Sequence, residues 1–124
     1  MTNRIVVPTV SQEGLNANLA QHFGRAPYFT AIDLNDEGNI MNVKMIPNVG
    51  EHAGGRGHAH NNILELQPDV IIVYGMGPRG LSTFQNAGIA VLRANSNIVS
   101  KVVAAYKDDK LQELTQGCQD AHHR

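Results

Sequence analysis

The sequence predicts an α/β fold in which one five-stranded mixed sheet packs against three helices. Three observations predict it. The first half of the chain contains short strand-like runs separated by turn residues. In the second half, apolar residues at helical spacing alternate with short apolar runs. The length of 124 residues, with 42% apolar residues, suits a single core.

Three strands are expected first, at residues 4–8, 28–34 and 39–47. The first is a run of β-branched residues, and the second alternates as a half-buried strand does. The turn sequence Asn-Asp-Glu-Gly at 35–38 joins the second strand to the third as a hairpin. Alternation in the third strand predicts two faces, one with Ile40, Asn42, Lys44 and Ile46, the other with Met41, Val43 and Met45.

The second half alternates between helix and strand. Helices are expected at 59–66, 78–88 and 98–106, and strands at 70–74 and 89–92. The first helix ends before Pro68, and the second begins at Pro78 and is capped by Gly88. The polar triplet at 95–97 is expected to cap the last helix. The continuous apolar run at 70–74 is typical of a central parallel strand.

This order of elements predicts a ribonuclease H-like arrangement. The first three strands form an antiparallel meander, and right-handed crossovers add the last two parallel to the first, in the order 3-2-1-4-5. The loops that start near Thr9, Asn48, Gly75 and Arg93 then emerge at one edge of the sheet. Ligands of open α/β sheets bind at this carboxyl edge, beside the switch point between strands one and four.

Composition excludes several classes of function. With 10 Lys and Arg against 11 Asp and Glu, the chain lacks the basic excess of a nucleic-acid binder. No apolar stretch approaches the ~20 residues that span a membrane, and no secretory signal is recognised. Cys118 is the single cysteine, so no intrachain disulfide can form. We expect a cytoplasmic protein with one domain over residues 1–108 and a polar tail over 109–124.

The first candidate site lies in the run Gln-His-Phe-Gly-Arg-Ala-Pro-Tyr at 21–28, in a loop expected to reach the carboxyl edge. The His22 imidazole can ligate a metal or carry a proton, and the Arg25 guanidinium can clamp an anion. The alternative is a loop that packs Phe23 and leaves His22 in solvent.

A second candidate is the glycine-rich loop at 51–60, which holds three histidines within nine residues: His52, His58 and His60. Its glycines allow a ligand to approach the backbone, and the amides of the following helix start favour anions. His58 and His60 can share a metal only if that helix begins after His60, because i and i+2 residues point to different faces. The alternative is a solvated loop.

The third candidate, Gly-Met-Gly-Pro-Arg-Gly at 75–80, has the formal pattern GxGxxG between a strand and a helix. A dinucleotide site also needs an acid ~20 residues later and a second nucleotide-binding half, and neither is present. Anion binding at the start of the helix remains a hypothesis. Gly75 and Gly77 would let the anion approach the backbone, and Arg79 would supply a positive charge. Close helix–strand packing would explain the glycines equally well.

No catalytic constellation is recognised. A two-metal nuclease needs acidic residues that converge on the centre of the sheet, and the first strand contains none. The GxSxG elbow of a serine hydrolase is absent as well. We therefore expect that the protein is not an enzyme.

Three stretches carry a family resemblance. They are Glu-Gly-Leu at 13–15 with His-Phe-Gly-Arg-Ala-Pro-Tyr-Phe at 22–29, Asn-Val-Gly at 48–50, and Val-Tyr-Gly-Met-Gly-Pro-Arg at 73–79 followed by Ala-Gly-Ile at 87–89. Over about residues 4–115 the chain resembles the dinitrogenase iron–molybdenum cofactor biosynthesis family, the group of NifX, NafY and the NifB C-terminal domain. The resemblance implies a ribonuclease H-like fold without nuclease activity and, as in characterised members, a carrier or store of an iron–sulfur or iron–molybdenum precursor cluster.

The resemblance also implies partners and roles for the candidate residues. Partners would be a metal–sulfur cluster and cofactor-assembly proteins. The family's loop histidine corresponds to His22, the expected metal ligand. Three further histidines would assist: His52, His58 and His60. Arg25, Arg79 and the helix-start amides would offset the charge of an anionic cluster. The alternative function is a small-anion or protein-partner binding module that has lost the cluster. The tail residues Cys118, His122 and His123 are expected at the opposite end of the sheet, in solvent.

Overall fold

The computed structural model describes residues 3–48 and 63–114. Predictions that concern His52, His58, His60, Cys118, His122 and His123 lie outside these ranges. The elements are β1 (Asn3–Thr9), the 3-10 turns η1 (Gly14–Asn16) and η2 (Phe23–Arg25), β2 (Tyr28–Leu34), β3 (Ile40–Pro47), β4 (Val70–Val73), α2 (Pro78–Asn86), β5 (Ala90–Arg93) and α3 (Val99–Lys107). Residues 63–65 are helical and form the end of the predicted first helix.

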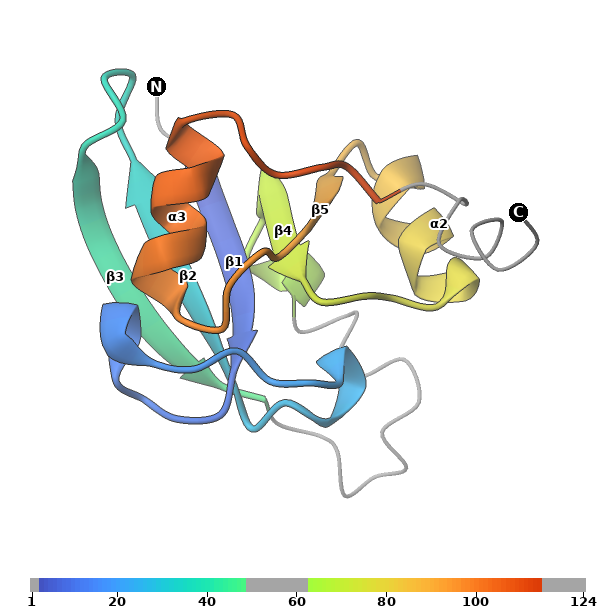
Figure 1. Cartoon of the computed structure of the whole chain (residues 1–124). Helices are drawn as coiled ribbons and strands as arrows, with labels where there is room; N and C mark the ends of the chain where they lie inside the picture. Colours follow the sequence, from blue (N-terminus) through green and yellow to red (C-terminus); the bar gives the residue numbers. More distant parts are fainter. Residues whose placement is uncertain (1–2, 49–62, 115–124) are drawn as a thin grey trace.

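The five strands form one sheet in the order β3-β2-β1-β4-β5, as predicted (Figure 1). Strand β1 pairs antiparallel with β2 and parallel with β4. Strands β2 and β3 pair antiparallel, and β4 and β5 pair parallel. The ribonuclease H-like arrangement is therefore confirmed, and the ends of β1 and β4 lie side by side at the carboxyl edge.

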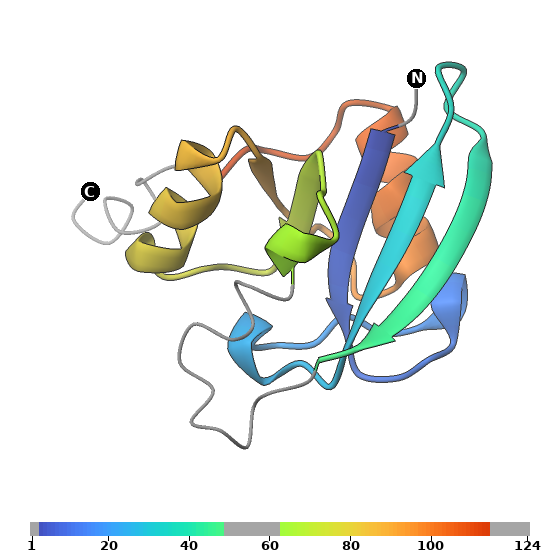
Figure 2. The ribbon, with the colours of Figure 1, turned by 180° about the vertical axis from the view of Figure 1, so that it is seen from behind.

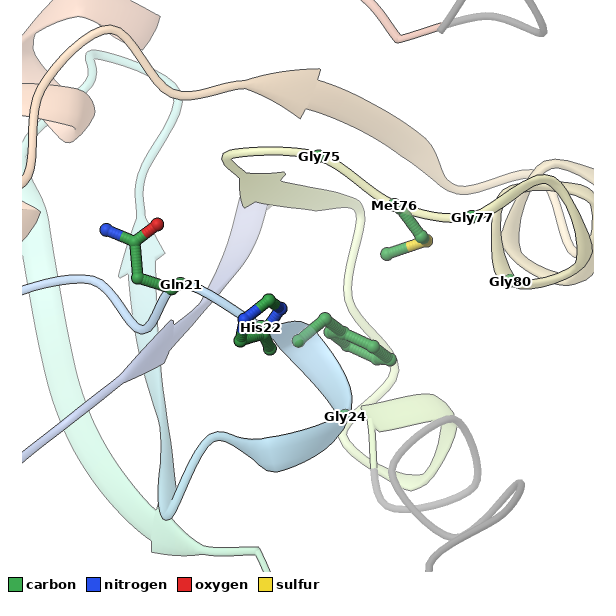
Figure 3. A pocket seen from close by; sticks show the side chains of 8 residues that line it. Gln21, His22, Gly24, Gly75, Met76, Gly77 and Gly80 are labelled. Atoms are coloured by element: carbon green, nitrogen blue, oxygen red, sulfur yellow. The ribbon is translucent and has the colours of Figure 1, made fainter. Parts of the chain in front are cut away.

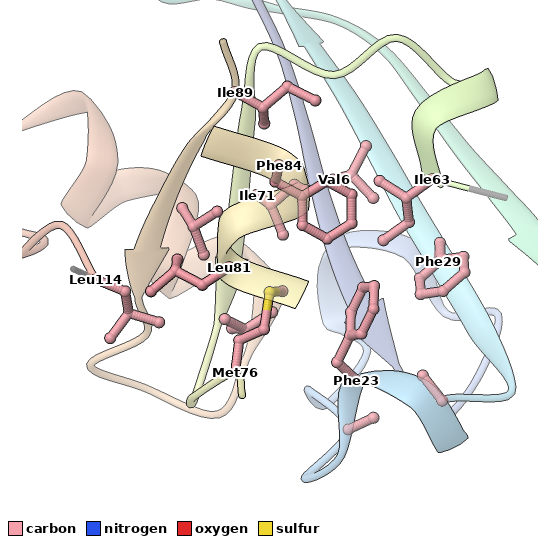
Figure 4. Close-up of a cluster of buried hydrophobic side chains, with 14 of the residues drawn as sticks. Val6, Phe23, Phe29, Ile63, Ile71, Met76, Leu81, Phe84, Ile89 and Leu114 are labelled. Atoms are coloured by element: carbon pink, nitrogen blue, oxygen red, sulfur yellow. The ribbon is translucent and has the colours of Figure 1, made fainter. Parts of the chain in front are cut away.

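Each face of the sheet carries its own apolar core, because side chains of successive strand residues point to opposite faces. On one face α3 packs over β1 and β2, and η1 contacts α3 and β3 (Figure 1). On the other face α2, η2 and the helical residues 63–65 cover β1, β4 and β5 (Figures 2 and 4). Phe84 and Ile63 are fully buried in this second core. The continuous apolar runs of β1 and β4 follow from burial on both faces.

The two main helices begin differently. Helix α2 starts with Pro78 at its first position and is followed by Gly88 with a positive φ of 80°, as predicted. Helix α3 is not capped by the polar triplet 95–97, so that prediction is wrong. Its N-cap is Ile98, which makes no side-chain capping bond, and the Val99 amide instead donates to the carbonyl of Ala17 at 3.1 Å. A tertiary contact replaces the local cap.

The residues that follow α3 run alongside the outer edge of β5 (Figure 1). The Arg93 amide donates to the carbonyl of Gln112 at 2.8 Å, and the Leu114 amide donates to the carbonyl of Val91 at 2.8 Å. Leu114 is 3% exposed. Residues 112–114, part of the segment that the sequence placed in a polar tail, therefore contact the domain. No helix in the described ranges has the length and apolar character to cross a membrane.

An ion pair ties the start of β1 to the strand beside it. The guanidinium of Arg4 contacts both carboxylate oxygens of Asp33, at 2.7 and 3.1 Å, and donates to the carbonyl of Leu66 at 2.7 Å. The hydrogen bond from Arg4 holds the pKa of Asp33 below its ordinary value, against the opposing effect of burial. The pair links the end of the first helix to the sheet.

This geometry predicts a loss of stability in acid. Because the pKa of Asp33 is lower in the folded state than in the unfolded chain, its contribution is present above the unfolded pKa of about 4 and is lost as the pH falls below it. We expect the Asp33→Asn variant to be less stable than the original chain at pH 6, and we expect this difference to be smaller at pH 2.5. Urea unfolding at both values measures this, and a difference that does not shrink in acid would contradict it.

Candidate functional site

A cavity of about 530 Å³ lies at the carboxyl edge of the sheet, between the η2 turn and the loop from β4 to α2 (Figure 3). One wall is formed by residues 21–24. The opposite wall is formed by Gly75, Met76, Gly77 and Gly80. The two walls are more than fifty residues apart in the sequence, and the parallel pairing of β1 with β4 brings them together.

The η2 wall is anchored by Phe23. Its ring centroid lies 5.8 Å from that of Phe29 on β2 and 5.7 Å from that of Phe84 on α2, the latter in an edge-to-face arrangement at 84°. Just before the turn, the Ala20 amide donates to the carbonyl of Pro8 at 2.9 Å. Because Phe23 is buried, its neighbours His22 and Gly24 stay at the surface and face the cavity (Figure 3).

The end of the same wall is fixed from β3. Asn48 is buried, its side-chain amide donates to the carbonyl of Ala26 at 2.8 Å, and its backbone amide donates to the carbonyl of Pro27 at 2.9 Å. These bonds hold the backbone of the turn in place without using the His22 side chain. The imidazole therefore stands on a turn whose backbone is held by other residues, an arrangement that suits a ligand-binding group.

The other wall is the start of α2. Gly77 is the N-cap residue, Pro78 follows at the first helical position, and no side chain caps the helix. The Leu81 amide already donates to the carbonyl of Gly77 at 3.0 Å. The amides of the two residues before Leu81 have no acceptor within the helix, because the first turn of a helix has none to offer. They give the wall a positive electrostatic character.

Three glycines line the cavity at positions where the fold leaves room for a side chain. A Cβ atom built on Gly24, Gly75 or Gly77 would meet nothing within 4 Å, and none of the three has a left-handed φ. By contrast, Gly88 has a positive φ of 80°, where only glycine is unstrained. The absent side chains at 24, 75 and 77 therefore leave open space beside the backbone, which a ligand can occupy.

The predicted site residues fall into three groups. His22, Gly75 and Gly77 line the cavity, so the structure brings these three together. Arg25 and Arg79 are exposed and do not line the cavity, although each is next in the sequence to a residue that does. The histidines of the loop at 51–60 lie outside the described residues. Within 3–48 and 63–114, no three His, Cys, Asp or Glu side chains gather as a metal-binding group.

Several cavity residues were missed from the sequence. Met76 is 8% exposed and carries a thioether, a soft donor, into the wall. It stands inside the glycine motif at 75–80, so the motif itself was the available signal. Gln21, Gly24 and Gly80 stand in the two predicted runs but were not assigned as site residues, since only their place in the fold distinguishes them. Among the described residues, none that lines the cavity is Lys, Arg, Asp or Glu, so the groups that they offer to an anion are backbone amides and His22.

A mixed sheet of order 3-2-1-4-5 with a glycine-lined cavity at the end of a central parallel strand defines a class of small ribonuclease H-like α/β proteins. Residues 4–109 match the sequence model of the family described as dinitrogenase iron–molybdenum cofactor. The chain belongs to this family.

The chain is also similar to one further sequence and to solved structures. An uncharacterised protein of Methanocaldococcus jannaschii, MJ0580, is 31% identical over 102 residues, which cover 80% of this chain and 85% of that protein. The crystal structure of PH0822 has a TM-score of 0.76 at 27% identity and covers 90% of this chain and 96% of its own. The apo form of the orange protein from Desulfovibrio gigas shares the fold, with a TM-score of 0.77 at 21% identity over 91% of this chain and 93% of its own.

Proposed function

We propose that the protein is a non-enzymatic carrier whose cargo is an anionic iron–sulfur or iron–molybdenum type cluster, or a precursor of one. The observation that carries the proposal is the open space at Gly24, Gly75 and Gly77, which lets a bulky ligand reach the backbone of both walls. Membership of the iron–molybdenum cofactor family supports this class of cargo. A carrier also implies cofactor-assembly proteins as partners that deliver or receive the cargo.

Each of the candidate residues has a proposed role in binding the cargo that follows from its chemistry. His22 is the proposed metal ligand, because a neutral imidazole binds iron and related metals. The Met76 thioether adds a soft contact from the opposite wall. The free amides at the start of α2 face the negative charge of the cargo, and Arg25 and Arg79 add positive charge at the entrance. The histidines at 52, 58 and 60 are proposed to assist.

Anaerobic reconstitution with iron and sulfide tests the proposal. We expect the protein to keep a visible absorption through gel filtration. The His22→Ala variant should retain the cluster more than about tenfold less well, because a metal site weakens by at least this factor when a supporting group is lost. Cys118→Ser is the matched control, and it should retain the cluster as the original chain does.

Two outcomes would contradict the proposal. If the cysteine variant alone releases the cluster, the ligand lies in the tail and not at the carboxyl edge. If the protein stays colourless after reconstitution, it does not carry such a cluster. Binding of a simple anion such as molybdate or phosphate, followed by calorimetry, would then favour the small-anion module.

A further inference from the structure

A second, smaller cavity of about 190 Å³ lies at the carboxyl end of β5, where the chain leaves the sheet. It shares no lining residue with the cavity between η2 and α2. Two of its lining residues carry a positive charge and two carry a carboxamide: Arg93 and Lys110, and Asn95 and Gln112. Among the described residues, none that lines it is Asp or Glu. The cavity therefore combines positive charge with amide donors.

The β5 wall of this cavity is fixed by backbone hydrogen bonds on both sides. The Arg93 amide donates to the carbonyl of Gln112 at 2.8 Å, and the Ala94 amide donates to the carbonyl of Val73 on β4 at 2.7 Å. The first bond places Gln112 beside Arg93, and the second holds the start of the following loop against the sheet. The backbone that carries the Arg93 guanidinium is thus held by two neighbouring segments.

The position of Lys110 follows from the way in which α3 ends. Asp109 has a left-handed φ of 59°. Its amide donates to the carbonyl of Tyr106 at 3.0 Å, and the Lys110 amide donates to the carbonyl of Ala105 at 2.9 Å. These two bonds form a Schellman motif, which ends the helix. The next residues run along β5, so Lys110 and Arg93 line the same cavity although they belong to different segments (Figure 1).

The segment after α3 separates its charges. Lys110 and Gln112 line the cavity at the end of β5, whereas the residues that alternate with them line a different cavity of about 290 Å³: Asp109, Leu111 and Glu113. Side chains of successive residues in an extended segment point to opposite sides, which accounts for this alternation. The two carboxylates of the segment therefore line the larger cavity and not the one that holds the cations.

Neither cation is engaged by another side chain of the described residues. Arg93 and Lys110 are exposed, and within 3–48 and 63–114 neither makes an ion pair or a side-chain hydrogen bond. Arg4, by contrast, is held by Asp33. Two positive charges that line one small cavity repel each other, and an anion bound between them offsets this repulsion.

From this arrangement we propose that the cavity binds a phosphate group, either as free phosphate or as the end of a small phosphorylated molecule. A guanidinium pairs with two phosphate oxygens through its planar fork, and an ammonium adds a point charge. The carboxamides of Asn95 and Gln112 supply N–H donors for the remaining oxygen.

Charge and size both suit this ligand. A phosphate monoester carries a charge of about −1.5 to −2 at pH 7, which two cations balance. The cavity of about 190 Å³ is smaller than the sites of ~300 Å³ or more that enclose a whole drug-sized ligand. It holds the phosphate group, and the rest of a phosphorylated molecule stays outside it.

Titration of the full chain with inorganic phosphate tests the proposal at low ionic strength, where charge interactions are screened least. We expect calorimetry to show saturable binding with a dissociation constant below about 1 mM, because the contacts are hydrogen bonds from charged groups. Arg93→Gln and Lys110→Gln should each weaken binding about tenfold, since each removes one charged donor. Arg93→Lys should weaken it less, because it keeps the charge and loses only the planar fork.

Lys44→Gln is the matched control. It removes the same charge from an exposed position on β3, at the opposite edge of the sheet, and it should leave phosphate binding unchanged. Circular dichroism should show all variants folded, because the substituted side chains are exposed. Glycerol 3-phosphate distinguishes the two sources of the ligand. Binding at least as tight as that of phosphate indicates a phosphorylated molecule, and weaker binding indicates free phosphate.

Three results would overturn the proposal. The first is no binding of phosphate at about 10 mM, tenfold above the expected limit of the dissociation constant. The second is a double variant, Arg93→Gln/Lys110→Gln, that binds phosphate as the original chain does. The third is a loss of phosphate binding in His22→Ala, which would place the anion in the cavity between η2 and α2. The experiment uses neither iron nor sulfide, so its outcome is independent of the proposed cluster cargo.

Discussion

Replacing Phe84 by alanine is expected to lower the free energy of unfolding by about 3–5 kcal/mol, the usual cost of removing a buried phenylalanine. Phe84 is fully buried on α2, and its ring meets that of Phe23 edge to face, so the substitution leaves a void where α2 and η2 join (Figure 4). Urea unfolding measures the loss.

The control for this prediction lies on the same helix. Asn86 is exposed at the end of α2, and Asn86→Ala should change the free energy of unfolding by less than about 0.5 kcal/mol. If the two variants lost similar amounts of stability, Phe84 would not hold the helix to the sheet as the structure indicates. The loss of stability in Phe84→Leu should fall between those of the two alanine variants, because leucine fills part of the void.

Substituting alanine for Gly75 is expected to separate binding from folding. The added methyl group meets no atom of the protein within 4 Å, and the backbone at 75 is not left-handed, so the fold should accept it. Stability should stay the same or rise by about 0.4–1 kcal/mol, since alanine restricts the unfolded chain. Cluster retention after reconstitution should nevertheless fall at least about tenfold, because the methyl group occupies the space proposed for cargo.

Gly88→Ala should show the opposite pattern. Its φ of 80° strains any residue with a side chain, so we expect a loss of about 1–2 kcal/mol in stability. The residue is not part of the cavity, so cluster retention should not change once the protein is folded. Equal cluster retention by the Gly75→Ala variant and the original protein would show that the cargo does not use the open space at Gly75.

Much of the fold could be predicted because local signals and topology agreed. The hairpin turn at 35–38, the buried run of β4 and the Pro78–Gly88 boundaries each pointed to one structure. The start of α3 could not be predicted from its polar triplet, because the decisive partner, the Ala17 carbonyl, lies far away in the sequence. Likewise the contact of residues 112–114 with β5 consists of two backbone hydrogen bonds and one buried leucine, which a mostly polar sequence does not reveal.

For the candidate site, the topology predicted that the cavity lies at the carboxyl edge of the sheet, but it did not predict all the residues that line it. His22, Gly75 and Gly77 follow from the rule that loops after parallel strands meet at the carboxyl edge. Whether an arginine in such a loop lines the cavity depends on packing that the sequence does not show, and Arg25 and Arg79 are not among the lining residues. Met76 was hidden because a buried methionine reads as core until its place beside a cavity is known.

The two walls of the cavity meet only in the folded chain, since residues 21–24 and 75–80 are held together by Phe23, Phe84 and the pairing of β1 with β4. A ligand that touches both walls therefore binds the native state and not the unfolded chain. At a free concentration a hundredfold above its dissociation constant, such a ligand adds about 2.7 kcal/mol to stability. Proteases act on the opened chain, so the empty protein would be degraded sooner than the loaded one. The supply of ligand would then set how long each molecule survives in the cell.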